Sequence, residues 1–170
     1  MPCGSSLARD QAEPVVARAS AGSLLDAMPL DSELTKALSR AIAEEIPARF
    51  VKVVDAVVAP DGRNAVILVL FNADTPDAVA MISFCLHDEG EWDELVTTDA
   101  GDVGTNWLGD RWVAYASGEA PAGATAVVAQ HAGATDRRPV TDGGLYVVAF
   151  FGPPGDDEFK LVRPPEIRFV

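Results

Sequence analysis

Five carboxylates fall within seven residues, at positions 88–94, and form the densest group of chemically capable side chains in the chain. Crowded carboxylates can bind Ca²⁺, and two that lie close together can share a proton in acid–base catalysis. The run Glu-Gly-Glu-Trp is also typical of an exposed hairpin turn, with Trp92 packed inward and the acids solvated. We favour the hairpin and expect it to present a binding surface. The residues assigned to this surface are Asp88, Glu89, Glu91, Asp93 and Glu94.

Oxygen-bearing side chains also recur between positions 99 and 110, with glycines between them. Short spacing and intervening glycines suit a Ca²⁺ loop. An EF-hand requires a bidentate Glu at its twelfth position, and counting from Asp99 reaches Asp110 instead. We therefore assign no metal and keep only a candidate Ca²⁺ set. Its members are Asp99, Asp102, Asn106 and Asp110.

His131, Asp142 and Ser117 are the residue types of a hydrolytic triad, but no G-x-S-x-G turn surrounds the serine. The two histidines form no H-x-x-x-H pair, and the cysteines Cys3 and Cys85 are too few for a disulfide framework. The chain has neither a P-loop nor a G-x-G-x-x-G motif. We therefore assign no catalytic residue and no cofactor, and we expect a protein without enzymatic activity.

The formal net charge of −13 is unevenly distributed. Residues 1–106 hold 18 acidic and 7 basic side chains, a net of −11, whereas residues 107–170 hold 8 and 6, a net of −2. Such a field repels phosphate, so we expect neither nucleic-acid nor membrane binding, but a basic protein partner. A homo-oligomer stays open. The N-terminus lacks a signal segment and no apolar run approaches roughly 20 residues, so we expect a cytoplasmic location.

One helix is predicted from Leu30 to Ile46, because apolar residues recur there with the spacing of one buried stripe. Asp31 or Ser32 can cap its start, and Pro47 ends it. Residues 1–22 show no apolar periodicity and are expected to form a mobile tail. The stripe consists of Leu34, Leu38, Ala41, Ile42 and either Glu45 or Ile46.

Short apolar runs after the helix predict an antiparallel β-meander against it. The run Ala65–Phe71 is apolar without alternation, so it should lie centrally and be covered on both faces. The helix would cover one face, and the C-terminal part of the chain or another chain the other. The expected strands are 50–59, 65–71, 78–86 and 92–97. One core is expected to contain Val66, Leu68, Leu70, Leu38 and Ile42.

Turn chemistry at 118–123, 131–139 and 141–144 divides the stretch 112–151 into strands. Asp142-Gly143-Gly144 predicts a tight hairpin, because glycine adopts positive φ without a Cβ clash. The motifs G-x-A-P-x-G-A-T-x-V and T-D-G-G-x-Y-x-V resemble those of carboxypeptidase-regulatory-like and related immunoglobulin-like β-sandwich modules. The resemblance implies a fold and, in most such modules, an accessory or binding role; Arg137-Arg138-Pro139 departs from it. The matching residues are Gly118, Ala120, Pro121, Gly123, Ala124, Thr125, Val127 and 141–147.

Two tryptophans flank the turn before this stretch, and aromatic residues are enriched at binding faces. Alternation along the strand that starts at Trp112 puts Trp112, Ala114 and Ala116 on one face. We expect Trp112 to lie in the core, which is the ordinary place for one tryptophan in a β-sandwich. Trp107 is expected to be partly exposed, and we add it to the binding surface.

The sequence thus predicts a mainly β (α+β) protein. An amphipathic helix packs on an antiparallel β-meander within residues 23–98, residues 99–110 form a linker or loop, and residues 111–170 form an immunoglobulin-like antiparallel β unit. We expect a non-enzymatic protein-binding or assembly module with an acidic surface. One alternative is a small hydrolase or isomerase with an acidic cleft between the two halves. Another is an immunity-type or accessory protein that masks a basic partner.

Overall fold

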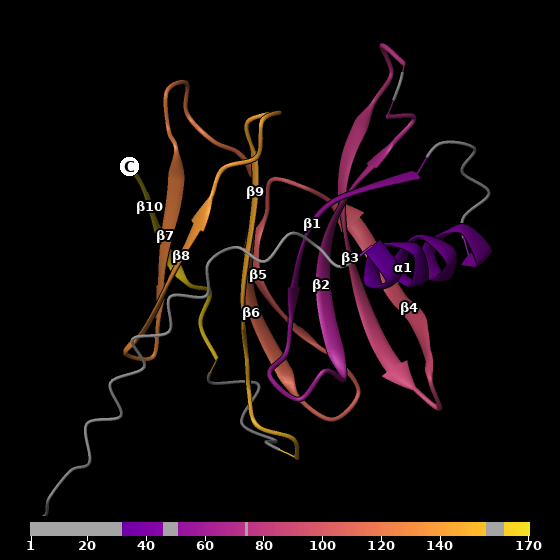
Figure 1. Cartoon of the computed structure of the whole chain (residues 1–170). Helices are drawn as coiled ribbons and strands as arrows, with labels where there is room; N and C mark the ends of the chain where they lie inside the picture. The colour runs from indigo at the N-terminus through magenta and orange to yellow at the C-terminus, as the bar shows by residue number, and fades with distance from the viewer. Residues whose placement is uncertain (1–31, 46–50, 74, 156–161) are drawn as a thin grey trace, which may run out of the picture.

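The computed structural model describes residues 32–45, 51–73, 75–155 and 162–170, which form four layers (Figure 1). Helix α1 lies on sheet A (order β1-β2-β3-β4), whose other face packs on sheet B (β5-β6-β9). Sheet C (β10-β7-β8) covers the far face of sheet B, and the strand pairs in all three sheets are antiparallel. The elements are α1 (Ser32–Glu45), β1 (Val51–Val58), β2 (Asn64–Phe71), β3 (Val79–Asp88), β4 (Glu91–Asp99), β5 (Val103–Trp107), β6 (Trp112–Glu119), β7 (Ala126–His131), β8 (Ala134–Pro139), β9 (Leu145–Phe151) and β10 (Glu166–Phe169).

Helix α1 packs on the meander through the stripe that its sequence predicts. Leu38, Ala41 and Ile42 are buried, while Glu33 and Lys36 lie on the exposed side and form an ion pair of 2.8 Å. The buried stripe removes apolar surface from water, which is the main driving force for docking a helix on a sheet. The predicted fold class, a mainly β protein with one helix on an antiparallel meander, is confirmed.

Strand β2 lies between β1 and β3, and its residues from Asn64 to Val69 are all buried. Ala65, Ile67 and Val69 contact the helix side, whereas Val66 and Leu68 contact sheet B. The prediction of a central strand covered on both faces is confirmed, and the C-terminal part of the chain supplies the second cover.

The expected single core of Val66, Leu68, Leu70, Leu38 and Ile42 is wrong. Successive side chains of a strand point to opposite faces, so β2 divides its apolar residues between two cores. The helix residues Leu38 and Ile42 pack with Ala65, Ile67 and Val69, on the other side of the sheet from Leu68.

Sheet B is apolar on both faces. From β9, Val147 and Ala149 pack toward sheet A, whereas Tyr146 and Val148 pack toward sheet C. The Phe84 ring of sheet A meets the Tyr115 ring of sheet B edge to face, with centroids 4.9 Å apart. The two halves expected from the sequence therefore share one apolar core between sheets A and B.

An ion pair also joins the two outer sheets directly. Arg138 of β8 donates from Nη2 to Asp55 Oδ1 at 2.8 Å and to the Ala56 carbonyl oxygen at 3.0 Å. Asp55 lies on β1, an edge strand of sheet A, at the register shift between Val53 and Asp55. The contact fixes sheet C relative to sheet A in addition to the apolar cores.

The expected linker or loop at residues 99–110 needs correction, because it contains strand β5. Glycines there suggested loose structure, but Gly104 lies opposite Tyr115 in the β5–β6 ladder. A Cβ at Gly104 would stand 2.9 Å from the Tyr115 hydroxyl oxygen. The glycine therefore makes room for a packed aromatic ring rather than providing flexibility.

The predicted turns in the C-terminal unit are only partly correct. Residues 131–139 were expected as a turn, but 134–139 form β8, and the reversal occurs at Ala132-Gly133, both with positive φ. Asp142-Gly143-Gly144 does form a tight turn, with the Thr141 amide donating to the Leu145 carbonyl at 2.9 Å. It is not a hairpin, because β8 pairs with β7 and β9 pairs with β6. The chain instead passes from sheet C to sheet B.

The predicted tail at residues 1–22 and the helix boundaries at Leu30, Asp31, Ile46 and Pro47 lie outside the described residues. Within the part of the chain that the structure describes, no helix is long and apolar enough to cross a membrane.

Replacing Leu68 with Ala tests the core between sheets A and B. Leu68 is fully buried, so the substitution should lower the free energy of unfolding by about 2–5 kcal/mol, measured by urea denaturation. Leu95→Ala is the matched control, because Leu95 is 43% exposed and its truncation should cost less than about 1 kcal/mol. Equal losses in the two variants would contradict the assignment of Leu68 to this core.

Candidate binding site

The acidic run lies on a tight two-residue hairpin between β3 and β4, as predicted. Glu89 and Gly90 form the turn with φ values of 50° and 94°, the double positive φ of a tight hairpin. Trp92 packs inward against the helix-side core, and its ring lies 5.0 Å from that of His87. The hairpin therefore has an apolar side held by the core and an acidic side facing water.

Four of the five predicted carboxylates, those of Asp88, Glu89, Glu91 and Asp93, are exposed. None of them takes part in an ion pair within the described residues. Glu94 is different, since it is half-buried and its Oε1 accepts a hydrogen bond from the Thr97 hydroxyl at 2.8 Å. The part of the hairpin that a partner can reach therefore consists of the first four carboxylates, which we call the acidic hairpin.

Cys85 lies opposite Glu94 in the β3–β4 ladder and is fully buried. Burial, reinforced by the negative charges of Glu94 and Asp93, raises the pKa of its thiol to about 12. A thiol that stays protonated is a poor nucleophile and a poor metal ligand. In the described residues, no three His, Cys, Asp or Glu side chains are grouped so that they could hold a metal ion.

The candidate Ca²⁺ set is not brought together. Strand β5 runs between Asp102 and Asp110, and an extended strand advances about 3.3 Å per residue. Asn106 Oδ1 accepts the Trp107 amide at 2.8 Å, and Asp110 forms ion pairs with Arg63 and Arg111. Asp99 is exposed at the end of β4. These oxygens do not converge on one point, so we withdraw the candidate site.

Arg111, which sequence reasoning did not single out, is a buried arginine that joins sheets A and B where the β1–β2 and β5–β6 turns meet. The Arg111 side chain is 3% exposed and donates from Nη2 to Asp61 Oδ2, and its Nε lies 3.4 Å from Asp110 Oδ1. The pKa of Asp61 lies below its usual range, mainly because of the hydrogen bond from Arg111 and next because of the one from the Arg63 amide. The β1–β2 and β5–β6 turns are thereby locked together.

Trp107 lies at the same end of the molecule as the acidic hairpin. The Arg63 carbonyl accepts the His87 amide of the hairpin at 2.7 Å, while the Arg63 guanidinium pairs with Asp110 at 3.3 Å. Trp107 is 36% exposed and its indole N–H donates to the Gly109 carbonyl at 2.9 Å, so the predicted partial exposure is confirmed. Figure 1 shows the β1–β2, β3–β4 and β5–β6 turns together at its lower end.

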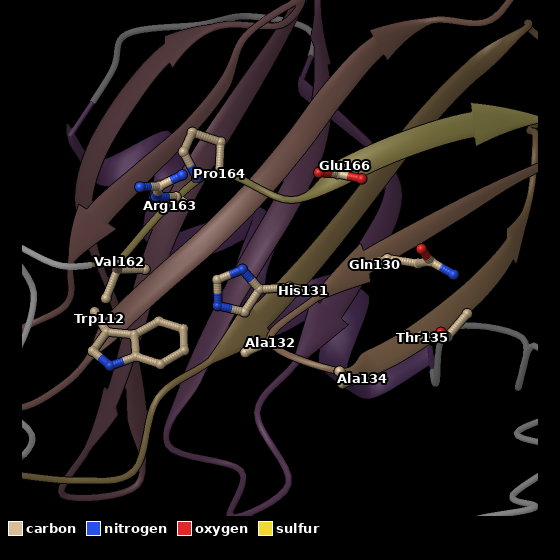
Figure 2. Close-up of a pocket in the computed structure, with 11 residues that line it drawn as sticks. Trp112, Gln130, His131, Ala132, Ala134, Thr135, Val162, Arg163, Pro164 and Glu166 are labelled. Atoms are coloured by element: carbon tan, nitrogen blue, oxygen red, sulfur yellow. The ribbon is translucent and has the colours of Figure 1, made fainter.

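Trp112 was expected in the core, but it is half-buried and lines a surface pocket of about 630 Å³ (Figure 2). Its indole ring lies 5.3 Å from the His131 imidazole, which lies 5.5 Å from the Phe150 ring. The alternation along β6 puts Trp112 on the same side as Ala116, toward sheet C. It did not reveal that the β7–β8 hairpin and the segment before β10 leave a hollow there.

The pocket extends the surface that carries Trp107. Trp107 and Trp112 are direct cross-strand partners in the β5–β6 ladder, so their side chains project from the same face at neighbouring positions. The described residues thus place the acidic hairpin, Trp107 and the pocket at one end of the layered sheets.

The triad residue types do not converge. His131 packs between Trp112 and Phe150, whereas Ser117 lies five positions further along β6 from Trp112, a distance of roughly 16 Å along a strand. Ser117 is buried, and its hydroxyl has no hydrogen-bond partner among the described residues. A hydrolase mechanism through these three residues has no geometric support.

Comparison with protein-family models, with curated proteins and with solved structures found no match. The resemblance of residues 112–151 to immunoglobulin-like modules therefore stays a prediction. The class that the described structure defines is an antiparallel, layered β protein with one helix.

The pH dependence of stability tests the packing of His131. Burial lowers the pKa of its imidazole from the ordinary 6.5, so the folded state favours the neutral ring. Stability should be fully present above pH 6.5 and fall as the pH drops from there through the folded-state pKa, because only the unfolded chain then binds the proton readily.

The comparison variant is His131→Phe, which keeps an aromatic ring between Trp112 and Phe150. Thermal unfolding at pH 8 and pH 5 should show a larger loss for the wild type than for this variant. An equal loss in both proteins would show that His131 is protonated as easily in the folded chain as in the unfolded one.

Proposed function

We propose that this chain is a non-enzymatic binding module that docks a basic protein partner on its acidic hairpin. The observation that carries the proposal is the group of four exposed carboxylates that enter no ion pair within the described residues. Trp107 stands at the same end of the molecule and is partly exposed, so we include it as an aromatic contact for the partner. Interfaces commonly combine an aromatic anchor with a charged rim.

The overall charge supports this choice of partner. Residues 1–106, which contain the hairpin, carry a net charge of −11. Exposed charges steer a partner of opposite sign and mainly accelerate association, an effect that salt screens over roughly 8 Å at physiological ionic strength. The two-residue turn and the pairing of β3 with β4 set the backbone positions from which these carboxylates project.

The enzymatic alternative is less well supported. An acidic cleft between the two halves would require carboxylates in the space between sheets A and B. That space is filled by apolar residues, among them Phe84, Leu68, Val113 and Val147. The accessory protein that masks a basic partner uses the same acidic hairpin, so it is a special case of the proposed function.

The test begins with capture of a partner on the immobilised protein and continues with its association kinetics. Replacing Glu89 and Glu91 with Gln and Asp93 with Asn should slow association on the order of tenfold at low salt. The dissociation rate should change much less, and the dependence of the association rate on salt should become weaker. Surface plasmon resonance at two salt concentrations measures all three quantities.

The matched control removes three negative charges from other turns and strand ends. Asp77→Asn, Glu119→Gln and Asp142→Asn change exposed residues near the β2–β3, β6–β7 and β8–β9 connections. This control should associate nearly as fast as the wild type. If the hairpin variant and the control both bind with wild-type kinetics, the acidic hairpin is not the docking surface.

A further inference from the structure

Strand β4 forms an open edge of sheet A. It ends the strand order β1-β2-β3-β4, so no described strand pairs with its other side (Figure 1). With nine residues it is the longest of the described strands that lie at the edge of a sheet. An edge strand presents N–H and C=O groups that lack a strand partner, and another extended chain can pair with them.

The register of the β3–β4 hairpin shows which backbone groups of β4 point outward. Opposite residues in an antiparallel ladder alternate between bonded and non-bonded pairs. Asp88 and Glu91 close the two-residue turn as a bonded pair. Trp92 and Glu94, which follow in non-bonded pairs, therefore direct their N–H and C=O groups away from β3.

The far half of β4 presents outward groups as well. The Ala100 amide donates to the Ala80 carbonyl oxygen at 3.0 Å, which makes these residues a bonded pair. Counting back from them places the backbone groups of Asp99 and Thr97 on the outward side. Leu95 is the extra residue at the register shift between the two halves. Such a bulge bends the strand, so the half beside the hairpin turn is a pairing site of its own.

Two other edges of the sheets are blunted by side chains. On β1, the Ala56 carbonyl oxygen accepts a hydrogen bond from Arg138, and the Ala56 amide donates to Asp55 Oδ1 at 2.8 Å. On β5, the Trp107 amide donates to Asn106 Oδ1 at 2.8 Å. Among the residues that the structure describes, no side chain caps the outward backbone groups of β4 in this way. Of these three edges, that of β4 is the one open to strand addition.

The charges on β4 select the kind of strand that can add. The strand holds four carboxylates, those of Glu91, Asp93, Glu94 and Asp99, and no basic residue. Like charges on paired strands are destabilising, so β4 of a second copy would be repelled from this edge. A strand with basic side chains would be attracted instead.

The two faces of β4 differ in what an added strand would meet. Trp92 packs into the helix-side core, so its neighbours Glu91 and Asp93 project on the opposite face, toward the side of sheet B. Leu95 and Val96 follow them and are 43% and 42% exposed. Lysine and arginine can lay their aliphatic stems on apolar surface while their charged ends reach a carboxylate. This edge therefore suits basic side chains on the face toward sheet B.

From these observations we infer that the basic partner adds to sheet A as an extended strand, antiparallel to β4. Its basic residues lie opposite Glu91 and Asp93, and the residues between them exchange backbone hydrogen bonds with Trp92 and Glu94. The inference rests on the proposed function and specifies the form of the partner, a basic segment in extended conformation. A folded basic surface that meets only the carboxylates would agree with the proposed function but not with this inference.

Backbone N-methylation separates strand addition from attraction between charges. The probe is an acetylated, amidated heptapeptide of alternating lysine and valine that begins and ends with lysine. Two relatives of equal charge carry three N-methyl groups each, either on the three valines or on three of the lysines. If the lysines lie opposite Glu91 and Asp93 in an antiparallel pairing, only the valine N–H groups point at β4.

Isothermal titration calorimetry with the full chain measures the affinities. The unmethylated peptide should bind with a Kd below about 1 mM. Methylation of the valines should raise the Kd at least about tenfold, because the backbone bonds to β4 are lost. Methylation of the lysines should change the Kd by less than about threefold, since those N–H groups point to solvent.

Amide hydrogen exchange locates the added strand. In saturating unmethylated peptide, the outward amides of Trp92 and Glu94 should exchange at least about tenfold more slowly than in the free chain. The amide of Asp93 already faces β3 and should change much less. This alternation along one strand is specific to pairing, because contact with the carboxylates alone leaves the outward amides in water.

Variants connect the strand to the charges. Glu91→Gln with Asp93→Asn should weaken the unmethylated peptide at least about fivefold, since both carboxylates face its lysines. The matched control, Asp77→Asn with Glu119→Gln, removes two exposed carboxylates elsewhere and should bind nearly as tightly as the wild type.

The inference is overturned if the valine-methylated peptide binds no more weakly than the lysine-methylated one. It is equally overturned if the unmethylated peptide shows no saturable binding, or if the Trp92 and Glu94 amides exchange at the same rate with and without it. The docking itself is tested separately, through the association kinetics of the captured partner with the hairpin variant. Failure of strand addition and failure of the proposed docking are therefore distinguishable.

Discussion

Strand β9 is apolar on both faces, and this double requirement for cover organises the layers of the protein. Val147 and Ala149 must be shielded on one side, and Tyr146 and Val148 on the other. Exposing either set would cost roughly 25 cal/mol for each Å² of apolar surface left in water. Sheet B can therefore be neither an outer layer nor an isolated unit, and sheets A and C must close on it from both sides. Helix α1 then covers the only large apolar face that sheet A has left.

The same arrangement explains why the candidate binding features gather at one end. Antiparallel strands return to the same ends of their sheets, so in the stack of sheets A, B and C the β1–β2, β3–β4, β5–β6 and β7–β8 connections all lie toward the lower end of Figure 1, with β3–β4 and β7–β8 on opposite sides of it. The buried side chain of Arg111 locks two of these turns through an ion pair with the exposed Asp61. A charged group at this depth is stable only while it is paired, so the contact specifies one relative placement of the turns. The turns that carry the candidate binding residues are thus held by the stacked sheets.

Local signals in the sequence were enough to predict the elements whose partners are near in the chain. The stripe of α1, the non-alternating β2 and the acidic hairpin each follow from spacing within about a dozen residues. The sequence said less about which strands pair with one another across long stretches of the chain. Thr141 to Gly144 form the predicted tight turn, yet that turn joins strands of two different sheets, which depends on where β7 lies. Glycine occurs in loops and also beside packed rings, so Gly104 did not indicate strand β5, in which it lies opposite Tyr115.

The residues of the candidate site divide in the same way, into those that local sequence predicts and those that depend on distant segments. The exposed carboxylates and Trp107 could be found from the sequence, because a hairpin turn and an alternating strand determine exposure locally. Arg111 and the pocket could not, since one depends on Asp61, 50 residues away, and the other on three distant segments. Nothing in the sequence indicated that Pro164 and Glu166 would line the same pocket as Trp112. Such a site depends on the stacking of the sheets, and therefore on the cover that β9 requires.

Residue-resolved hydrogen exchange in increasing denaturant tests this dependence most directly. If sheet B is the shared centre of one cooperative unit, slowly exchanging amides of β2 in sheet A, β9 in sheet B and β7 in sheet C should converge on one free energy of opening and one denaturant dependence. The amides of β9 should be at least as protected as those of any other strand. Opening of sheet C at a clearly lower free energy, with β2 and β9 still protected, would show that the layers are separate units and contradict the account.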